Sequence, residues 1–324
     1  MGNIHTDLAV EAREIYSQET KGKTDGVDYK DYKIGDFQIT DVTIVNELGE
    51  QKMGKPIGKY ITLDLPNFVH YDGDAIDEAS KALAECMEPL INIDKGMTAL
   101  VVGLGNWNIT PDALGPKVVS RLMITRHLRE LIPDSIDEGI RPVCAIAPGV
   151  LGTTGIESVE IVKSLVDRIK PNIIICIDAL AARKLNRVNR TIQIGNTGIS
   201  PGSGVGNKRM ELSEKSLGVP IIAIGVPTVV DAATMANDTI DLVVDEMIEN
   251  ATEGSKFYDL LKCMNKEDKA RMIREVLDPY GGNLMVTPKE VDMVIDSLSK
   301  IIANGINISL QPALELDDIN KFLN

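Results

Sequence analysis

Two aspartates stand at points of the chain where buried strands are expected to end. Asp112 lies in a glycine-rich turn, 103–116, that follows the apolar run 98–102. Asp178 directly follows 172–177, the most apolar strand-like run in the chain. In open α/β sheets the carboxyl ends of parallel strands meet at one edge, and ligands bind there. We therefore expect the two carboxyls to converge.

Two carboxyls that lie close together cannot both ionise cheaply, so they share a proton. One can then act as a base on a water molecule and the other as an acid, which suits hydrolysis of a peptide bond. Thr110 is predicted to be the N-cap and Pro111 the first residue of a helix, which places Asp112 at the positive end of its dipole. This position favours ionised Asp112 and predicts that it is the base. Singly, each aspartate is more often structural than catalytic.

Other chemistries lack some of the residues that they need. His5, His70 and His127 are not within metal-ligand spacing of one another, and there is no His-Glu-x-x-His motif, so a zincin site is excluded. No histidine follows the glycine-rich loop 195–208, which removes the residue order of α/β hydrolases. Its part 201–209 resembles a phosphate loop but does not have Walker A spacing. No metal and no cofactor are predicted.

Composition narrows the class of protein. The 324 residues carry a net charge of −14, which argues against direct binding to bare nucleic acid or to an anionic membrane. The four cysteines are widely separated, as free thiols in a reducing compartment would be. There is no apolar signal segment and no membrane-spanning run, so we expect a cytoplasmic protein.

The elements that must position the two aspartates follow a strand–helix alternation. This pattern predicts an α/β fold with a mostly parallel sheet flanked by helices, an N-terminal β-hairpin portion at 37–65 and a helical C-terminal portion at 251–324. Residues 17–36 are expected to form a surface loop. Predicted strands are 37–45, 59–65, 97–103, 142–147, 172–177, 191–194 and 219–226. Predicted helices are 74–90, 111–131, 155–169, 179–185, 212–217, 232–249 and one that begins at 287–290 and stops at 304–305.

Long motifs along nearly the whole chain carry a family resemblance. They are residues 6–12, 102–116, 125–127, 147–157, 177–183, 201–209, 224–231 and 283–292. These stretches resemble the germination protease family of spore-forming bacteria. The resemblance implies an aspartic-type peptidase whose fold is like that of the hydrogenase-maturation peptidases. Its catalytic aspartates lie in Asn-Trp-Asn-x-Thr-Pro-Asp and Ile-Asp-Ala-Leu motifs, which here give Asp112 and Asp178.

The same resemblance implies a substrate and a maturation step. The substrates are small acid-soluble spore proteins, cut at sites of the Glu-(Phe/Ile)-Ala-Ser-Glu type. The enzyme is a homotetrameric zymogen of the forespore and spore core that cleaves itself as the core acidifies and dries. The cut would follow Asp7 and leave Leu8 as the new terminus, dividing the chain into a propeptide, 1–7, and a single peptidase domain, 8–324. The run from Asp7 to Glu11 has the acidic, large apolar, Ala, x, acidic order of the substrates.

Loops are expected to shape the cleft around the two carboxyls. They are 103–110, 148–155 and 198–208, and Trp107 is expected to pack in the wall. The predicted substrate-binding or cleft residues are Asn106, Asn108, Arg183, Gly202, Ser203, Gly204, Lys208 and Arg209. Arg183, Lys208 and Arg209 would attract acidic residues beside the cut bond, although they would serve equally well as solvated surface charges. Two alternatives stay open: a metallopeptidase for the same substrates, or an anion- or nucleotide-binding protein using loop 201–209.

Overall fold

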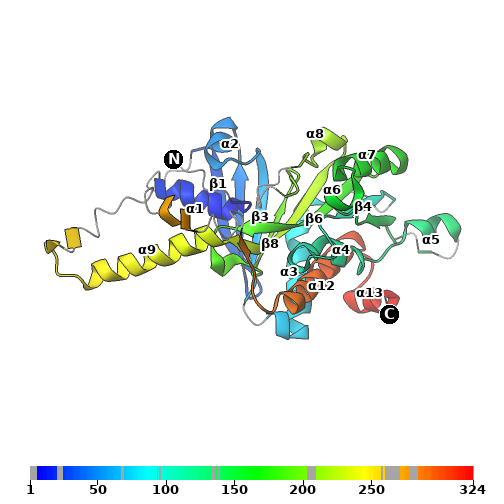
Figure 1. Cartoon of the computed structure of the whole chain (residues 1–324). Helices are drawn as coiled ribbons and strands as arrows, with labels where there is room; N and C mark the ends of the chain where they lie inside the picture. Colours follow the sequence, from blue (N-terminus) through cyan, green and yellow to red (C-terminus); the bar gives the residue numbers. More distant parts are fainter. Residues whose placement is uncertain are drawn as a thin grey trace.

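A computed structural model shows the arrangement of these elements. It describes residues 6–19, 25–66, 69–92, 94, 96–132, 136–137, 139–202, 209–256, 258–259, 271–273, 275–276 and 284–323. Figure 1 shows one central sheet with helices on both sides of it.

The described strands form one nine-stranded sheet in the order β1-β2-β3-β7-β8-β6-β4-β5, and β9 pairs with β8. Their bounds are β1 Val27–Ile34, β2 Phe37–Ile44, β3 Gly58–Asp64, β4 Ala99–Gly103, β5 Val143–Ile146, β6 Ile173–Ala182, β7 Thr191–Gly195, β8 Ile221–Asp231 and β9 Met285–Val286. The run β8-β6-β4-β5 is parallel, and the other pairs are antiparallel. The predicted α/β class is confirmed, and the N-terminal strands extend the same sheet.

Helices α3, α4 and α12 cover one face of this sheet with apolar side chains, and α7 and α8 cover the other. The α-helices are α1 Ala9–Glu19, α2 Glu47–Met53, α3 Gly73–Met87, α4 Leu114–Val119, α5 Arg126–Leu131, α6 Leu151–Thr154, α7 Ser158–Ile169, α8 Glu214–Leu217, α9 Ala232–Asn250, α12 Val291–Leu310 and α13 Leu316–Leu323. The 3-10 helices are η1 Val69–Tyr71, η2 Glu88–Leu90, η3 Thr110–Asp112 and η5 Leu185–Arg187.

Alternate residues of the central strands point into two different apolar cores. Val101 and Ile175 pack with α3, α4 and α12, whereas Leu100 and Cys176 pack with α7 and α8. Successive side chains of a strand point to opposite faces, so strands covered on both faces must be apolar throughout. This is why β4 and β6 were recognisable as nearly continuous apolar runs.

Four predictions about these elements were wrong. Residues 27–34 form β1 instead of a loop, because an edge strand can expose charged residues while its backbone pairs with β2. Residues 179–185 are not a helix, since β6 stays paired with β8 as far as Ala182. The helix predicted at 111–131 is replaced by η3, α4 and α5. Helix α12 continues past Gly305, where an added Cβ would meet Leu83 of α3 at 2.8 Å.

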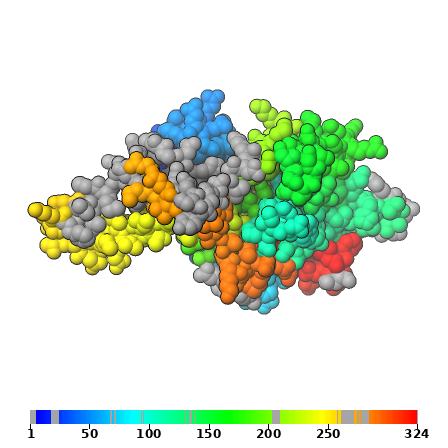
Figure 2. All heavy atoms as spheres, viewed as in Figure 1, coloured from blue at the N-terminus to red at the C-terminus, as the bar shows by residue number. Residues whose placement is uncertain are grey.

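Helix α9 projects away from the body of the molecule and forms an arm in the space-filling view (Figure 2). Of its residues only Ala232, the first, is buried. None of the described helices is both long and apolar enough to cross a bilayer. Cys86 and Cys176 are buried, Cys144 is half-buried, and these three described cysteines form no disulfide; Cys263 lies outside the described residues.

Candidate active site

The turn after β4 folds back against its own strand because two glycines lack side chains. A Cβ on Gly103 would lie 2.2 Å from the carbonyl oxygen of Gly115, and one on Gly105 would lie 2.0 Å from that of Asp112. Gly105 also has φ +113, which L side chains rarely adopt. The N–H of Asn106 then donates to the Asp112 carbonyl at 3.0 Å, and Asn106 Oδ1 accepts from the N–H of Asn108. These contacts fix the backbone that carries Asp112.

Replacing Gly105 with alanine should therefore displace Asp112. We expect kcat/KM for peptide cleavage to fall by about 10²-fold, since a shift of about 1 Å in a reacting group has that effect. Backbone strain should lower the free energy of unfolding by about 1–3 kcal/mol. The matched control is Gly73→Ala, where nothing lies within 4 Å of the added Cβ. Equal activity of the two variants, measured with one peptide substrate, would contradict this account of the turn.

The helical environment of Asp112 differs from the prediction. Asp112 is the last residue of η3, whose N-cap is Ile109, and α4 begins only at Leu114. Thr110 is thus not an N-cap; its hydroxyl donates to Asp292 Oδ1 on α12 at 2.8 Å. A three-residue 3-10 helix has little dipole, so the predicted reason for ionised Asp112 was wrong.

Asp178 lies where β4 ends and not where β6 ends. Gly103, the last residue of β4, pairs with Ile177, and the N–H of Leu104 donates to the Ile177 carbonyl at 2.8 Å. Asp178 is therefore the first residue of β6 that lies beyond the end of the neighbouring strand, β4. Its side chain is only 4% exposed, and its Oδ1 accepts from the N–H of Ala179 at 2.9 Å.

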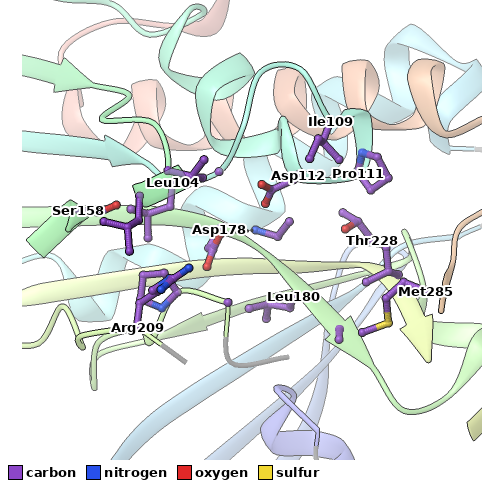
Figure 3. A pocket seen from close by; sticks show the side chains of 18 of the residues that line it. Leu104, Ile109, Pro111, Asp112, Ser158, Asp178, Leu180, Arg209, Thr228 and Met285 are labelled. Carbon is purple, nitrogen blue, oxygen red and sulfur yellow. Dashed lines mark hydrogen bonds between the residues drawn. The ribbon is translucent and has the colours of Figure 1, made fainter. Parts of the chain in front are cut away.

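The two aspartates line one cavity of about 400 Å³. Figure 3 shows both carboxyl groups pointing into the same space, from the turn after β4 and from β6. The wall is mostly apolar, with Arg209 and Ser158 among its polar members. The other lining residues are Leu104, Gly105, Ile109, Pro111, Gly149, Val150, Leu151, Glu157, Ala179, Leu180, Ala181, Pro201, Gly202, Thr228, Val229, Met285 and Thr287. Residues from all three predicted cleft loops are present.

Burial sets the protonation of the pair. It raises the pKa of Asp112 to about 6, although hydrogen bonding from the Asn106 backbone lowers it. The pKa of Asp178 is raised well above its ordinary value, first by burial and then by the charge of Asp112. The charge of Asp7 raises it further, and the Ala179 N–H lowers it. Near neutral pH the arrangement therefore favours ionised Asp112 and protonated Asp178.

Several predicted cleft residues lie outside this cavity. Asn106 and Asn108 hold the turn instead, and Arg183 binds Asp238 through both terminal nitrogens at 2.9 and 3.1 Å. Trp107 was predicted to pack in the wall, which was wrong: it is 54% exposed. Ser203, Gly204 and Lys208 fall outside the described residues.

The prediction missed the far wall, formed by β8 and β9. The hydroxyl of Thr287 donates to the carbonyl of Thr228 at 2.9 Å and ties the two segments together. Met285 lies beside them in the cavity (Figure 3). The available signal was that these residues belong to the motifs 224–231 and 283–292. Among the described residues, no three His, Cys, Asp or Glu side chains are grouped so that they could hold a metal ion.

Comparison of the whole chain with known proteins identifies its family. The family model described as "Germination protease" matches residues 6–263 and 243–323. A germination protease of Clostridium tetani is 64% identical over 99% of this chain and 100% of the relative. One of Clostridium perfringens (strain ATCC 13124) is 61% identical over the full length of both chains. Among solved structures, a [NiFe] hydrogenase maturation protease HycI from Thermococcus kodakarensis KOD1 is 15% identical, covering 60% of this chain and 97% of that one, with a TM-score of 0.28. On the family match and these identities, the chain belongs to the germination protease family and is a peptidase.

Proposed function

We propose that this peptidase is an aspartic-type endopeptidase that cuts small acid-soluble spore proteins during germination. The observation that carries the proposal is the shared apolar cavity into which Asp112 and Asp178 both point. An apolar wall strengthens the interaction between the two groups and separates their pKa values. The substrate class and the homotetrameric, spore-core form come from the family resemblance.

The chemistry assigns one role to each carboxyl. Ionised Asp112 takes a proton from a water molecule, whose oxygen attacks the carbonyl carbon of the peptide bond. Protonated Asp178 donates its proton to the carbonyl oxygen, giving a tetrahedral diol. The proton held by Asp112 then passes to the amide nitrogen and the carbon–nitrogen bond breaks. A hydroxyl of the diol returns its proton to Asp178 as the carboxyl group forms. Because Oδ1 of Asp178 accepts from the Ala179 N–H, its other oxygen is left to carry the proton.

We also propose that the chain is a zymogen that removes residues 1–7 itself. In the structure Asp7 Oδ2 accepts from the N–H of Ala181 at 3.0 Å, and Leu8 is fully buried. Asp7 lines a second cavity, and neither residue lines the one that holds the two catalytic carboxyls. Self-cleavage at Asp7–Leu8 therefore requires this segment to leave β6 first.

Cleavage of a defined peptide tests the proposed function. A peptide that carries one Glu-Ile-Ala-Ser-Glu site should be cut once, before the isoleucine, as mass spectrometry of the products would show. Cleavage should resist chelators, and kcat/KM should rise as the pH increases through about 6 and Asp112 loses its proton.

The alternatives predict other results. Loss of cleavage on chelation, restored by a divalent metal, would favour the metallopeptidase. An uncut peptide together with tight binding of phosphate or nucleotides would favour the anion-binding protein. A rate that falls as the pH rises from 5 to 7 would contradict the assignment of Asp112 as the base.

A further inference from the structure

The edge of β6 beyond the end of β4 is not paired with any strand in the described part of the chain. Pairing with β4 stops at Ile177, whereas β6 continues to Ala182. Unpaired N–H groups of such an edge are ready binding sites for another peptide. The first of them, on Ala179, donates to the carboxylate of Asp178 itself.

The next N–H group of this edge, and two more just after β6 ends at Ala182, donate to two carboxylates of the N-terminal segment. The N–H of Ala181 donates to Asp7 Oδ2 at 3.0 Å. The N–H groups of Arg183 and Lys184 donate to the two oxygens of Glu11, each at 2.9 Å. Charge-assisted hydrogen bonds of this kind are about twice as strong as neutral ones, and they distinguish a carboxylate from an amide.

An apolar contact lies between the two acidic ones. Leu8 is fully buried and Val10 is 4% exposed, and both pack on Leu180 of β6 with Ile199 beside them. Helix α1 begins at Ala9, so Glu11 lies in its first turn and Asp7 just before it. All three side-chain classes of the run from Asp7 to Glu11 thus meet a matching surface.

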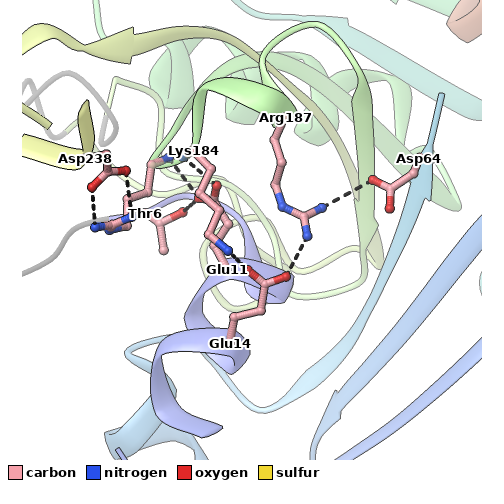
Figure 4. Close-up of polar contacts among 8 residues, drawn as sticks. Thr6, Glu11, Glu14, Asp64, Lys184, Arg187 and Asp238 are labelled. Atoms are coloured by element: carbon pink, nitrogen blue, oxygen red, sulfur yellow. Dashed lines mark hydrogen bonds and ion pairs between the residues drawn. The ribbon is translucent and has the colours of Figure 1, made fainter. Parts of the chain in front are cut away.

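The backbone of the segment is held as well. The side-chain amide of Gln193 on β7 accepts from the N–H of Ala9 at 2.6 Å and donates to the carbonyl of Asp7 at 3.2 Å. Thr6 accepts from the N–H of Leu8 and donates to Glu11, a contact visible in Figure 4. Because the Gln193 side chain binds both a donor and an acceptor of the backbone, it fixes the direction of a bound peptide.

Two basic side chains next to this edge, those of Arg183 and Lys184, bind other carboxylates. Arg183 is bound to Asp238, and Lys184 to Glu14 at 2.7 Å (Figure 4). The carboxylates of Asp7 and Glu11 are therefore bound by backbone N–H groups and not by the side chains of Arg183 and Lys184. Burial lowers the pKa of Lys55, which lines the cavity beside Asp7, while the carboxylates of Asp7 and Glu11 oppose that shift.

We infer that this edge is a binding site for acidic peptides in which acidic residues four positions apart flank an apolar one. We name it the β6 edge site, formed by the N–H groups of Ala181, Arg183 and Lys184 with Leu180. The uncut chain fills it with its own residues Asp7 to Glu11. That substrate segments can also occupy it rests on the proposed function, because the same residue order marks both substrate and propeptide junction. A segment held here must leave the site before its own bond is cut.

The position of the site predicts how it acts. Ala181 is three residues from Asp178, or about 10 Å along a strand. The peptide bond that follows the acidic residue held by Ala181 therefore lies away from the carboxyl groups of Asp112 and Asp178. The site therefore holds an acidic peptide beside the catalytic cavity. A tethered segment competes at an effective concentration of about 1 mM, which excludes peptides that bind more weakly.

Peptide binding in trans tests this inference. The probe is a labelled, end-capped peptide with the sequence of residues 6–11, and its partner carries amides in place of both acidic side chains. Fluorescence anisotropy compares the full unsubstituted chain with the full-length double variant Asp7→Asn/Glu11→Gln, whose own segment is weakened. The acidic peptide should bind the double variant at least about tenfold more tightly than the unsubstituted chain, and about tenfold more tightly than the amide peptide.

Controls separate this inference from the proposed function. Glu14→Gln changes a carboxylate of the same helix, α1, and this carboxylate binds only side chains in the structure. This variant should therefore bind the probe no more tightly than the unsubstituted chain does. Glu11→Gln alone serves the same purpose as the double variant should the latter not fold. Equal binding of the two peptides, or no gain in either variant, overturns the β6 edge site. Selective binding of the acidic peptide without any cleavage by the enzyme leaves the site standing and overturns the peptidase mechanism instead.

Discussion

Replacing Asp178 or Asp112 with asparagine should lower kcat for peptide cleavage by about 10²–10⁴-fold. Asparagine keeps the shape of the side chain but can neither remove a proton from water nor donate the acidic proton that the other role requires. KM should change little, because the apolar wall of the cavity is unaltered. Initial rates with the Glu-Ile-Ala-Ser-Glu peptide measure both constants.

The double variant and a distant control sharpen this experiment. If the two carboxyls work as one unit, Asp112→Asn/Asp178→Asn should be no less active than the weaker single variant. Asp167→Asn, an exposed position on α7, should retain full activity. A single variant that still removes its own first seven residues at the normal rate would show that the dyad is not the catalytic group.

Asp112→Asn should also stabilise the chain at neutral pH. Burial raises the pKa of Asp112 from 3.8 to about 6, so between these values the folded chain holds a proton that the unfolded chain has released. Stability from this group is complete below pH 4 and is lost as the pH rises towards 6. At pH 7 the loss is about 2 kcal/mol after allowance for partial exposure. Asparagine does not titrate, so Asp112→Asn removes this loss of stability at pH 7.

Urea unfolding at pH 4 and at pH 7 would test this prediction. The variant and the unsubstituted chain should differ little at pH 4, and the variant should be more stable at pH 7. Asp167→Asn should show no such pH-dependent difference. A variant that is less stable at pH 7 would mean that ionised Asp112 is held by favourable contacts, contrary to the rise of its pKa. Gain of stability with loss of activity is the usual sign of a strained catalytic group.

The convergence of Asp112 and Asp178 was predictable because strand ends and glycine-rich turns leave strong local signals. The rule that parallel strands meet at one edge then joined two residues 66 positions apart. The reason for the position of Asp178 was wrong, however. The sequence around it marks the end of an apolar run, but pairing with β8 keeps β6 extended to Ala182, and only the length of β4 places Asp178 at an opening.

What could not be predicted depends on contacts between distant segments. The charged residues of β1 conceal an edge strand whose conformation is decided by pairing with β2. Met285 and Thr287 reach the cavity because β9 pairs with β8. Likewise, no local pattern indicates that Asp7 would bind Ala181, since that contact spans 174 positions.

The glycines of the turn after β4 also decide how this enzyme could be redesigned. At Gly103, Gly105 and Gly115 any side chain would meet backbone atoms at 2.0–2.3 Å, so this half of the cavity offers no freedom to an engineer. The opposite half is built from side chains, among them Thr228 and Met285. A library intended to change the preferred peptide should vary those side chains and leave the glycines alone.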